Sequence, residues 1–243
     1  MILRKGDKIQ IPGSYQHDAL YEGNFVQRSW HRLKYKEALK VAKPLNGDVI
    51  LDVGCGSGVL SNMLAEQYGA TVTGIDGNVE AIKFCKEQYH LENLSFKYMI
   101  FEDIATHFHD NTIDKIFFLE TIEHITKAQA ENLMNIFYRI LKPGGTLIIT
   151  TPNKFSFWPL TEFILDRFKL VPDLGEGQHE HIYSSKELRA LVVSSGFTKI
   201  FSEKLLLFAP WLSFMGKKFT DVLHRLESND LLPGSLLLHV YRK

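Results

Sequence analysis

The 243-residue chain carries 28 Lys and Arg side chains against 28 Asp and Glu, so its formal net charge is zero. A chain of this length buries a substantial core as one large domain or two small ones. Because the charges balance, no overall field favours nucleic acid, which we do not expect as a partner. Hydrophobic residues make up 45% of the chain and charged residues 23%, which excludes a disordered chain and is ordinary for a soluble globular protein.

Two cysteines, Cys55 and Cys85, are too few for a disulfide framework, and reduced thiols in a cytosolic protein are the plain interpretation. The first ten residues alternate charged and apolar side chains, which is not the pattern of a signal peptide. The longest apolar stretch, Leu205 to Gly216, contains Pro210 and is too short to span a bilayer. We therefore expect a cytoplasmic protein whose only membrane contact would be peripheral.

Residues 1–43 are expected to form an N-terminal extension that is irregular at first and helical from about Asn24. The helical part is basic, with Glu37 as the opposing charge. A basic helix is usually a solvated face, and the alternative is a contact for an anionic substrate or a membrane surface. The basic residues concerned are Arg28, Arg32, Lys34, Lys36, Lys40 and Lys43.

Residues 44–243 follow a different pattern, in which apolar runs alternate with amphipathic segments. This alternation predicts parallel strands joined by right-handed helical crossovers. The turn signal Pro143-Gly144-Gly145 should stop a long helix and start the fifth strand. We predict strands at 48–53, 71–76, 95–100, 114–119 and 145–151, and helices at 58–68, 79–89 and 127–141.

The first predicted strand, Val49–Val53, runs directly into the loop Gly54-Cys55-Gly56-Ser57-Gly58, and the second ends at Asp76. A strand, glycine turn, helix and strand in this order bind a nucleotide-like ligand, and the acidic residue can accept hydrogen bonds from a ribose diol. Gly58 comes too early for the dinucleotide fingerprint, and no Lys-Ser or Lys-Thr pair follows as in a P-loop. Free N–H groups in the loop would instead suit the carboxylate of S-adenosylmethionine, which has a ribose but no phosphate.

On these residues the chain resembles the class I S-adenosylmethionine-dependent methyltransferases. Leu51–Gly58 is similar to their first motif and Gly74-Ile75-Asp76 to their second. Phe101-Glu102-Asp103 stands where their adenine pocket is expected, and Leu141–Gly145 is similar to the turn before their fifth strand. The resemblance covers about residues 45–204 and implies the same fold and cofactor.

The resemblance implies a cofactor site along the ends of the first four strands. Asp76 is expected to bind the ribose, and the two residues after it to line the ribose or the adenine. Asp52 is expected to tether loop amides or the methionine amino group, or to make a core hydrogen bond alone. The ring of Phe101 can stack on the adenine, and the carboxylate beside it can accept from the adenine amine. The predicted cofactor-binding residues are Asp52, Gly54, Cys55, Gly56, Gly58, Asp76, Gly77, Asn78, Phe101, Glu102 and Leu119.

Three histidines are the predicted catalytic residues. Methyl transfer from a sulfonium requires alignment and exclusion of water, and a hydroxyl acceptor must also lose a proton to a base of near-neutral pKa. His124, His179 and His181 fall at or after strand carboxyl ends, which is the functional edge of this architecture. We predict that at least one of them contacts the acceptor or acts as the base. Packing alone is the alternative.

Within the family, Glu120–His124 and Thr151-Pro152-Asn153 most resemble the ubiquinone-biosynthesis O-methyltransferases and their relatives. That narrower resemblance implies magnesium at Glu120, Glu123 and His124, because such enzymes are described as using it at the matching positions. Two carboxylates and an imidazole can hold a hard cation that polarises a hydroxyl. The alternative is that the Glu residues favour the positive end of a helix dipole.

After the fifth strand the alternation is interrupted by two aromatic-rich insertions, at about 153–183 and 205–232. We expect both to lie over the cofactor edge as a lid for an apolar acceptor, with core packing as the alternative. Lys217, Lys218 and Arg225 also make the second a predicted interfacial helix on an anionic membrane. The remaining predicted elements are a helix at Ser184–Ser195, a sixth strand within 197–208, a helix at 211–226 and a final antiparallel strand at 235–241.

The sequence therefore predicts an α/β fold with a doubly wound, seven-stranded, mostly parallel sheet and helical lid additions. The expected function is methyl transfer from S-adenosylmethionine to a small acceptor, apolar or lipid-like, most readily through oxygen. N- and C-methylation are alternatives, as is RNA methylation through the basic helix, although a motif resembling Asn-Pro-Pro-Tyr is missing. An alternative from another class is a protein that binds the cofactor without turnover.

Overall fold

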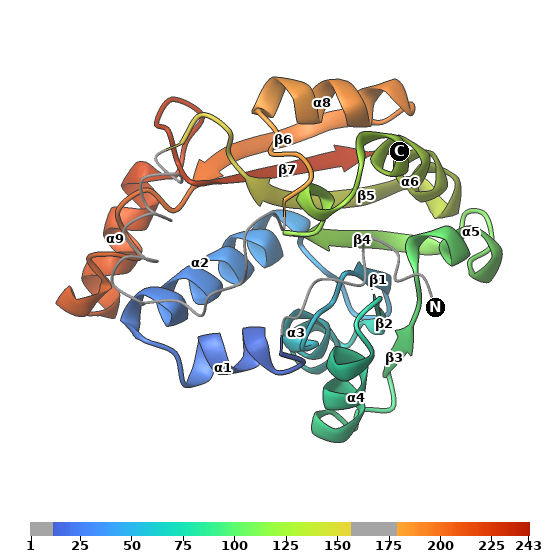
Figure 1. The fold of residues 1–243 in the computed structure, drawn as a ribbon, viewed down its shortest axis with the longest axis horizontal. Coiled ribbons are helices and arrows are strands. Elements are labelled where there is room, and N and C mark those ends of the chain that lie inside the picture. The colour runs from blue at the N-terminus through green and yellow to red at the C-terminus, as the bar shows by residue number, and fades with distance from the viewer. Residues whose placement is uncertain (1–11, 157–178) are drawn as a thin grey trace.

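The computed structural model describes residues 12–156 and 179–243, which form a seven-stranded sheet with helices on both faces (Figure 1). The strand order is β3-β2-β1-β4-β5-β7-β6, which confirms the predicted doubly wound arrangement. The strands are β1 (Val49–Val53), β2 (Thr71–Asp76), β3 (Leu94–Tyr98), β4 (Ile113–Leu119), β5 (Leu141–Pro152), β6 (Thr198–Leu205) and β7 (Leu236–Arg242).

The first five strands are parallel, and β7 runs antiparallel between β5 and β6. Strand β1 lies between β2 and β4, so the chain turns from one half of the sheet to the other at this point. In open α/β sheets, ligands bind outside the carboxyl ends of the strands at such a switch point. The topology therefore directs attention to the ends of β1, β2 and β4.

Two hydrophobic clusters hold the helices to the two faces of the sheet. One includes residues of α6 (Lys127–Ile140) and α8 (Ser185–Ser194), and the other includes residues of α2 (Phe25–Ala42) and α3 (Val59–Tyr68). Since both faces are covered, β4 is apolar along its whole second half, and 116–118 is fully buried. The shorter α4 (Val79–Gln88) covers the outer end of the sheet beside β3.

The N-terminal part contains two helices where the sequence predicts one. Helix α2 begins as expected, because the Asn24 side chain accepts hydrogen bonds from Val26 N and Gln27 N, both at 3.0 Å. The preceding α1 (Tyr15–Tyr21) is not predicted. Its one buried residue is Ala19. The helix therefore has no buried apolar face whose spacing of 3.6 residues could have predicted it from the sequence.

The prediction for the start of the fifth strand is wrong by four residues. Helix α6 ends at Ile140, and β5 begins directly at Leu141 instead of at residue 145. Its pairing with β4 then skips to Thr146, and Gly144 has a φ of 81° within the skipped turn. The residues Pro143-Gly144-Gly145 do form a turn, but this turn is an irregularity within β5 and does not mark the start of the strand.

The C-terminal elements follow the prediction apart from one break. Helix α8 lies where it is predicted, and the side chains of Ser184 and Glu187 form a capping box at its start. The helix predicted at 211–226 is instead divided at Gly216, whose φ of 99° lies in the region that favours glycine. The two parts are η4 (Ser213–Met215) and α9 (Lys217–Glu227).

Three short helical segments carry no clear sequence signal: η2 (Phe101–Asp103), α5 (Ile104–His107) and η3 (Ile122–His124). Most of the insertion predicted at about 153–183, namely 157–178, lies outside the described residues. Within the described part of the chain, none of the helices has the length and apolarity needed to cross a bilayer.

Candidate active site

The glycine loop follows β1 and passes close to β4. Gly54, Gly56 and Gly58 have φ values of 74°, 50° and 72°. A Cβ atom on Gly54 would lie 2.3 Å from Thr121 Oγ1, so glycine is required both by the backbone conformation and by the approach of the next strand end. The loop is therefore locked against the residues that follow β4.

The loop amides are engaged by protein acceptors, contrary to the expectation of free N–H groups. Gly54 N and Cys55 N donate to the Ile75 carbonyl at 2.8 and 3.0 Å. Ser57 N donates to Gln16 Oε1 at 3.0 Å. A ligand carboxylate would thus have to displace Gln16 to reach the amide of Ser57.

Asp76 ends β2 and faces the loop. Its two carboxylate oxygens accept from Gly56 N at 2.8 Å and from Asn78 N at 2.7 Å. Burial raises the pKa of Asp76, while these two hydrogen bonds oppose the rise. A carboxylate has about four lone-pair positions, so two remain for the hydroxyls of a ribose. The position agrees with the predicted role.

Asp52 is buried beneath the loop. It accepts a hydrogen bond from Ser61 Oγ at 2.6 Å, which ties β1 to α3. Burial raises its pKa to about 7, and the charge of Asp76 adds to this rise. Of the three predicted roles, the geometry matches the core hydrogen bond.

Helix α1 covers the loop, which the sequence does not predict. Besides the Gln16 contact, His17 N donates to Ser57 Oγ at 2.9 Å. A Cβ atom on Gly56 would lie 2.4 Å from the Gln16 side chain. These contacts join residues about 40 positions apart, and no local sequence pattern reports them.

The remaining predicted cofactor residues surround the loop and Asp76. Gly77 faces open space, and Asn78 caps α4 by accepting from Glu80 N and Ala81 N. Leu119 is nearly buried at the end of β4.

Phe101 and Glu102 lie in η2 after β3. The Phe101 ring is half-buried and meets Phe118 edge-on, with centroids 6.3 Å apart. Glu102 is exposed and lies 3.4 Å from Gln129 Nε2. Their roles at the adenine stay predictions.

Cys55 and Cys85 are free and buried beside the loop. Cys85 Sγ contacts the Gly56 carbonyl at 3.2 Å. Burial raises the pKa of the Cys55 thiol well above its ordinary value, which disfavours the thiolate. Cys55 therefore serves as a small residue in the loop.

An ion pair joins α2 to the end of β4. Lys34 is buried, with 4% of its side chain exposed, and its ammonium binds the Glu120 carboxylate. Trp30 Nε1 donates to the same carboxylate at 3.4 Å. Desolvation opposes the ionisation of Glu120, but the charge of Lys34 outweighs it and lowers the pKa of the carboxyl. The interpretation of the basic helix as a solvated face is wrong for Lys34.

Glu123 lies within η3 and is 1% exposed. Its side chain accepts from Thr151 Oγ1 at 3.0 Å, and its carbonyl accepts from Glu180 N at 2.7 Å and His181 N at 3.2 Å. Burial, followed by the charge of Glu120, raises the pKa of the Glu123 carboxyl to about 8. The group is therefore uncharged at neutral pH.

Two of the three predicted catalytic histidines meet at this point. The rings of His124 and His179 lie 5.2 Å apart, and ligand atoms of Glu123, His124 and His179 lie within 4.8 Å of one another. Burial and the nearby His124 lower the pKa of His179, so its ring is neutral at pH 7. His181 instead packs its ring on Tyr183, with centroids 4.5 Å apart.

The predicted magnesium set differs from the set that the structure brings together. Glu120 is bound by Lys34, and His179 stands nearest to Glu123 and His124 in its place. Magnesium prefers charged oxygen ligands, whereas two of the three side chains that the structure brings together are imidazoles. The donor set does not fit magnesium.

The glycine loop, Asp76 and the histidine pair lie along one edge of the sheet. His124 is close enough to Asp76 for its charge to lower the pKa of that carboxyl. The structure thus brings the residue predicted to bind the ribose close to two of the histidines predicted to be catalytic.

A protein-family model described as a methyltransferase domain matches residues 45–206 of this chain. The mouse protein named ubiquinone biosynthesis O-methyltransferase, mitochondrial, is 30% identical over 172 residues, covering 68% of this chain and 45% of that protein. Phosphoethanolamine N-methyltransferase 2 of Caenorhabditis elegans is 34% identical over 125 residues, covering 49% and 28%. Sterol 24-C-methyltransferase ERG6 of Saccharomyces cerevisiae is 29% identical over 143 residues, covering 56% and 35%. The chain thus spans less than half the length of each of these relatives.

Solved structures share the fold. A SAM-dependent methyltransferase from Archaeoglobus fulgidus has a TM-score of 0.66 at 17% identity, covering 94% of this chain and 99% of that one. Phosphoethanolamine N-methyltransferase 2 of Haemonchus contortus, solved with S-adenosyl-L-methionine, has a TM-score of 0.59 at 17% identity, covering 86% and 52%.

We expect Asp76→Asn to weaken S-adenosylmethionine binding by about tenfold or more, which is the scale of a hydrogen bond to a charged group, roughly 1.5–3 kcal/mol. The amide keeps the shape of the side chain but loses the charge and one acceptor. Isothermal calorimetry measures the affinity, and Asp110→Asn at an exposed position is the matched control. Equal affinities for the two variants would remove Asp76 from the ribose site.

We expect Glu123→Gln to flatten the pH dependence of stability. Since the folded pKa of Glu123 is about 8 and the unfolded pKa is about 4.3, the folded state holds a proton that the unfolded state releases between these values. The stabilisation from this group is complete below the unfolded pKa and is lost as pH rises through the folded pKa, by at most about 1.4 kcal/mol per unit.

Denaturant unfolding from about pH 5 to about pH 8 measures this slope. The difference in unfolding free energy between wild type and Glu123→Gln should shrink as pH rises, while Glu87→Gln on the exposed side of α4 should give a constant difference. A constant difference for Glu123→Gln as well would show that the carboxyl is already ionised.

Proposed function

The chain belongs to the methyltransferase domain family, and on that premise we propose that it transfers the methyl group of S-adenosylmethionine to a small, apolar or lipid-like acceptor at an oxygen atom. The observation that carries the proposal is the Asp76 carboxylate beside the glycine loop, with the neutral His179 and its neighbour His124 at the next strand end. The residue that would bind the ribose and the histidines that would accept the acceptor's proton thus lie at the same edge of the sheet.

When bound, the cofactor supplies a methyl group on a sulfonium, a good leaving group. The protein's part is to hold that group in line with the acceptor and to exclude water, which contributes up to about 7–11 kcal/mol in favourable cases. Asp76 orients the ribose end, and helix α1 closes over the loop through Gln16 and His17.

The acceptor proton is assigned to the histidine pair. Glu120 is neutralised by Lys34, and Glu123 already holds a proton at neutral pH, so neither carboxyl is a suitable base. His179 has a lowered pKa and stands ready as a neutral imidazole. A hydroxyl placed against His179 or His124 can lose its proton as the methyl bond forms.

The relatives are named as O-, N- and C-methyltransferases, so their names do not decide which atom of the acceptor is methylated. Oxygen is favoured here because a neutral base is in place, which an unprotonated amine would not need. N- or C-methylation is the alternative within enzymes, RNA methylation is disfavoured by the balanced charge, and cofactor binding without turnover is the alternative from another class. The cytoplasmic location stays a prediction.

We expect release of S-adenosylhomocysteine with a hydroxylated, apolar acceptor such as a substituted catechol or a long-chain phenol. The assay compares these with amine acceptors of matched size and with a structured RNA. Asp76→Asn should lose most of the activity at subsaturating cofactor and recover part of it at high cofactor concentration. If no acceptor supports turnover while calorimetry shows tight cofactor binding, the protein is a binding module.

We expect the activity to survive chelation by EDTA, because the donor set does not fit magnesium. His179→Gln and His124→Gln should each lower kcat, by about a hundredfold for the residue that is the base, while the exposed His107→Gln should not. For wild type, the rate should hold as pH falls to below about 6.5, because the pKa of His179 is lowered. Activity lost in EDTA and restored by magnesium would contradict the proposal.

A further inference from the structure

Helix α9 packs with its polar side inward, against the usual order. Its buried residues are Thr220, His224 and Glu227, which recur at helical spacing on one face. On the opposite face, Phe219 and Val222 are exposed, and Leu226 is 71% exposed. A surface helix normally buries its apolar stripe, so this orientation needs a cause.

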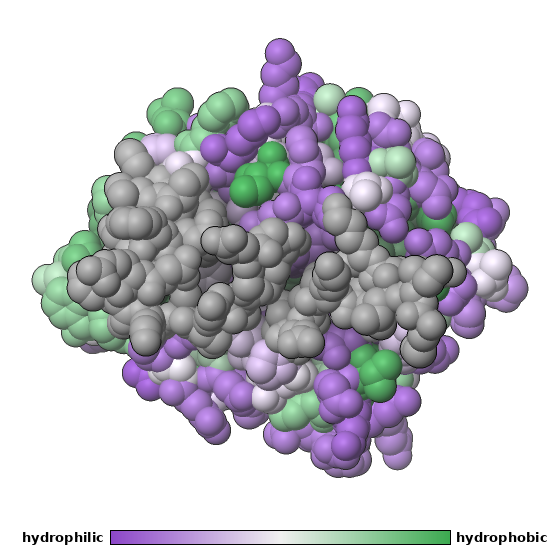
Figure 2. Space-filling view, in the orientation of Figure 1, coloured by the Kyte–Doolittle hydropathy of each residue, from purple (hydrophilic) through white to green (hydrophobic). Residues whose placement is uncertain are grey.

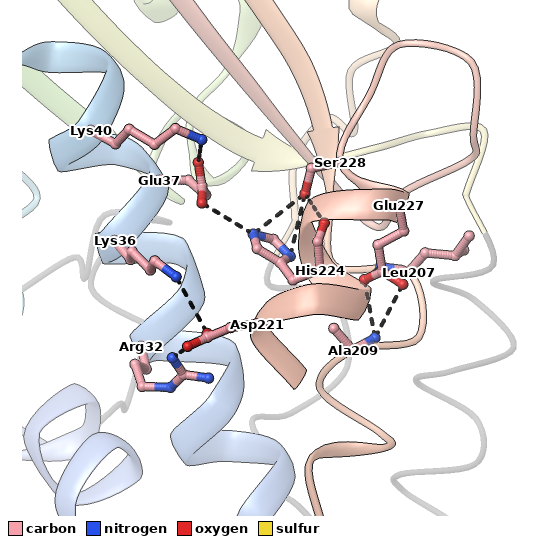
Figure 3. Close-up of polar contacts among 10 residues, drawn as sticks. All are labelled: Arg32, Lys36, Glu37, Lys40, Leu207, Ala209, Asp221, His224, Glu227 and Ser228. Carbon is pink, nitrogen blue, oxygen red and sulfur yellow. Dashed lines mark hydrogen bonds and ion pairs between the residues drawn. The ribbon is translucent and has the colours of Figure 1, made fainter. Parts of the chain in front are cut away.

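Polar contacts fix the orientation, as Figure 3 shows. Asp221 binds Arg32 at 2.7 Å and Lys36 at 3.3 Å, both on α2. The His224 ring lies 3.7 Å from the Glu37 carboxylate, and burial lowers the pKa of His224 to about 4, so the ring is neutral. These contacts dock α9 on α2 by its polar side.

Glu227 completes the attachment at the end of α9. Its carboxylate accepts backbone hydrogen bonds from Leu207 N, Phe208 N and Ala209 N, at 2.9–3.0 Å for the closest oxygen of each. The chain that leads into the helix is therefore held by the same inward face (Figure 3). Rotating α9 to bury its apolar stripe would break all of these contacts.

The outward apolar stripe continues beyond the helix. Phe214 is 67% exposed and meets the exposed ring of Phe25 edge-on, with centroids 5.9 Å apart, and Met215 is exposed beside it. We call this set the α9 face: Phe25, Phe214, Met215, Phe219, Val222 and Leu226. Figure 2 shows hydrophobic side chains gathered at the left edge of the molecule, where α9 lies in Figure 1.

The unpaired charged residues of α9 have one sign. Both acids of α9, Asp221 and Glu227, are turned inward and bonded. Lys217, Lys218 and Arg225 are exposed, and none of them makes an ion pair within residues 12–156 and 179–243. An apolar stripe bordered by cations is the pattern of a helix that lies in a membrane interface.

A hollow of about 300 Å³ opens beside the stripe, between α2 and the start of α9. Arg28, Arg32 and Lys217 line it together with Ser29. The Ser29 hydroxyl is buried and has no hydrogen-bond partner in the described chain. Arg32 is held by Asp221, while Arg28 and Lys217 make no ion pair in the described residues, so two cations and a free hydroxyl donor form a site suited to an anionic headgroup.

We propose that the α9 face docks on an anionic phospholipid surface, with the apolar stripe in the headgroup boundary and a headgroup in the Arg28–Lys217 hollow. A second copy of the chain is a poorer occupant, because a twofold contact would bring Lys217, Lys218 and Arg225 against the same cations. The inference does not depend on the identity of the methyl acceptor.

Sedimentation with vesicles tests the proposal, using the full chain. Vesicles of phosphatidylglycerol and phosphatidylcholine should pull the protein down at low salt, vesicles of pure phosphatidylcholine much less, and binding should fall as salt rises. Phe219→Gln with Leu226→Gln should weaken binding by about tenfold or more. Lys217→Glu with Lys218→Glu should weaken it by about fivefold per charge.

Matched controls separate docking from nonspecific adhesion. Val193→Gln removes a valine of 41% exposure from α8, and Lys83→Glu with Lys86→Glu reverses two exposed charges on α4. Both controls should bind vesicles as wild type does, and all variants should keep wild-type melting curves and cofactor affinity.

Two results would overturn the proposal. One is failure of the wild-type chain to bind anionic vesicles, and the other is an equal loss of binding in the control variants. If sedimentation velocity shows a dimer that Phe219→Gln with Leu226→Gln converts to a monomer while vesicles stay unbound, the α9 face is a self-interface. Unchanged turnover in detergent-free solution would leave the proposed methyl transfer intact in each case.

Discussion

Lys34 carries an ammonium group from α2 to the carboxyl end of β4, where Glu120 stands in a left-handed conformation with a φ of 48°. Without this partner, burial would raise the pKa of the Glu120 carboxyl and so disfavour its charged form. The charge of Glu120 in turn raises the pKa of the neighbouring Glu123. Removing one partner of a buried pair typically costs about 3–5 kcal/mol, because the other charge is left behind. The pair therefore sets the charge state of the whole strand end.

The charge states of the neighbouring groups follow from this pair. With Glu120 held as a carboxylate, its charge and burial keep Glu123 protonated. Burial and the nearby His124 lower the pKa of His179 against the opposing charge of Glu120, so its ring is neutral at pH 7. The ion pair thus engages one of the two carboxyls at this strand end, and the charge of that carboxyl helps to keep the other protonated.

Sequence reasoning reached the sheet because the sheet depends on local patterns. The apolar run that ends at Asp76 and the Gly54–Gly58 turn specify strand, turn and strand within 30 residues, and the structure places both as predicted. The capping box at Ser184 works in the same way. Each of these signals joins residues that are close in the chain.

The missed features join residues that are far apart. Gln16 meets Ser57 across 41 positions, and Lys34 meets Glu120 across 86. Lys34 does have one local signal, because it lies on the same helical face as Trp30 and Ala38 instead of on a polar one. For α9, the period of 3.6 was visible, but the choice of buried face depended on the cations of α2, which the sequence cannot orient.

Helix α2 links the site to the α9 face. Lys34 on one side of this helix reaches Glu120, while Arg32 and Lys36 on another side hold Asp221 of α9. An α-helix with its side chains is about 10–12 Å across, and both α9 and α2 stand between a surface docked on the α9 face and the strand end. One helix therefore carries both the ion pair at the strand end and the ion pairs that hold the apolar stripe of α9 outward.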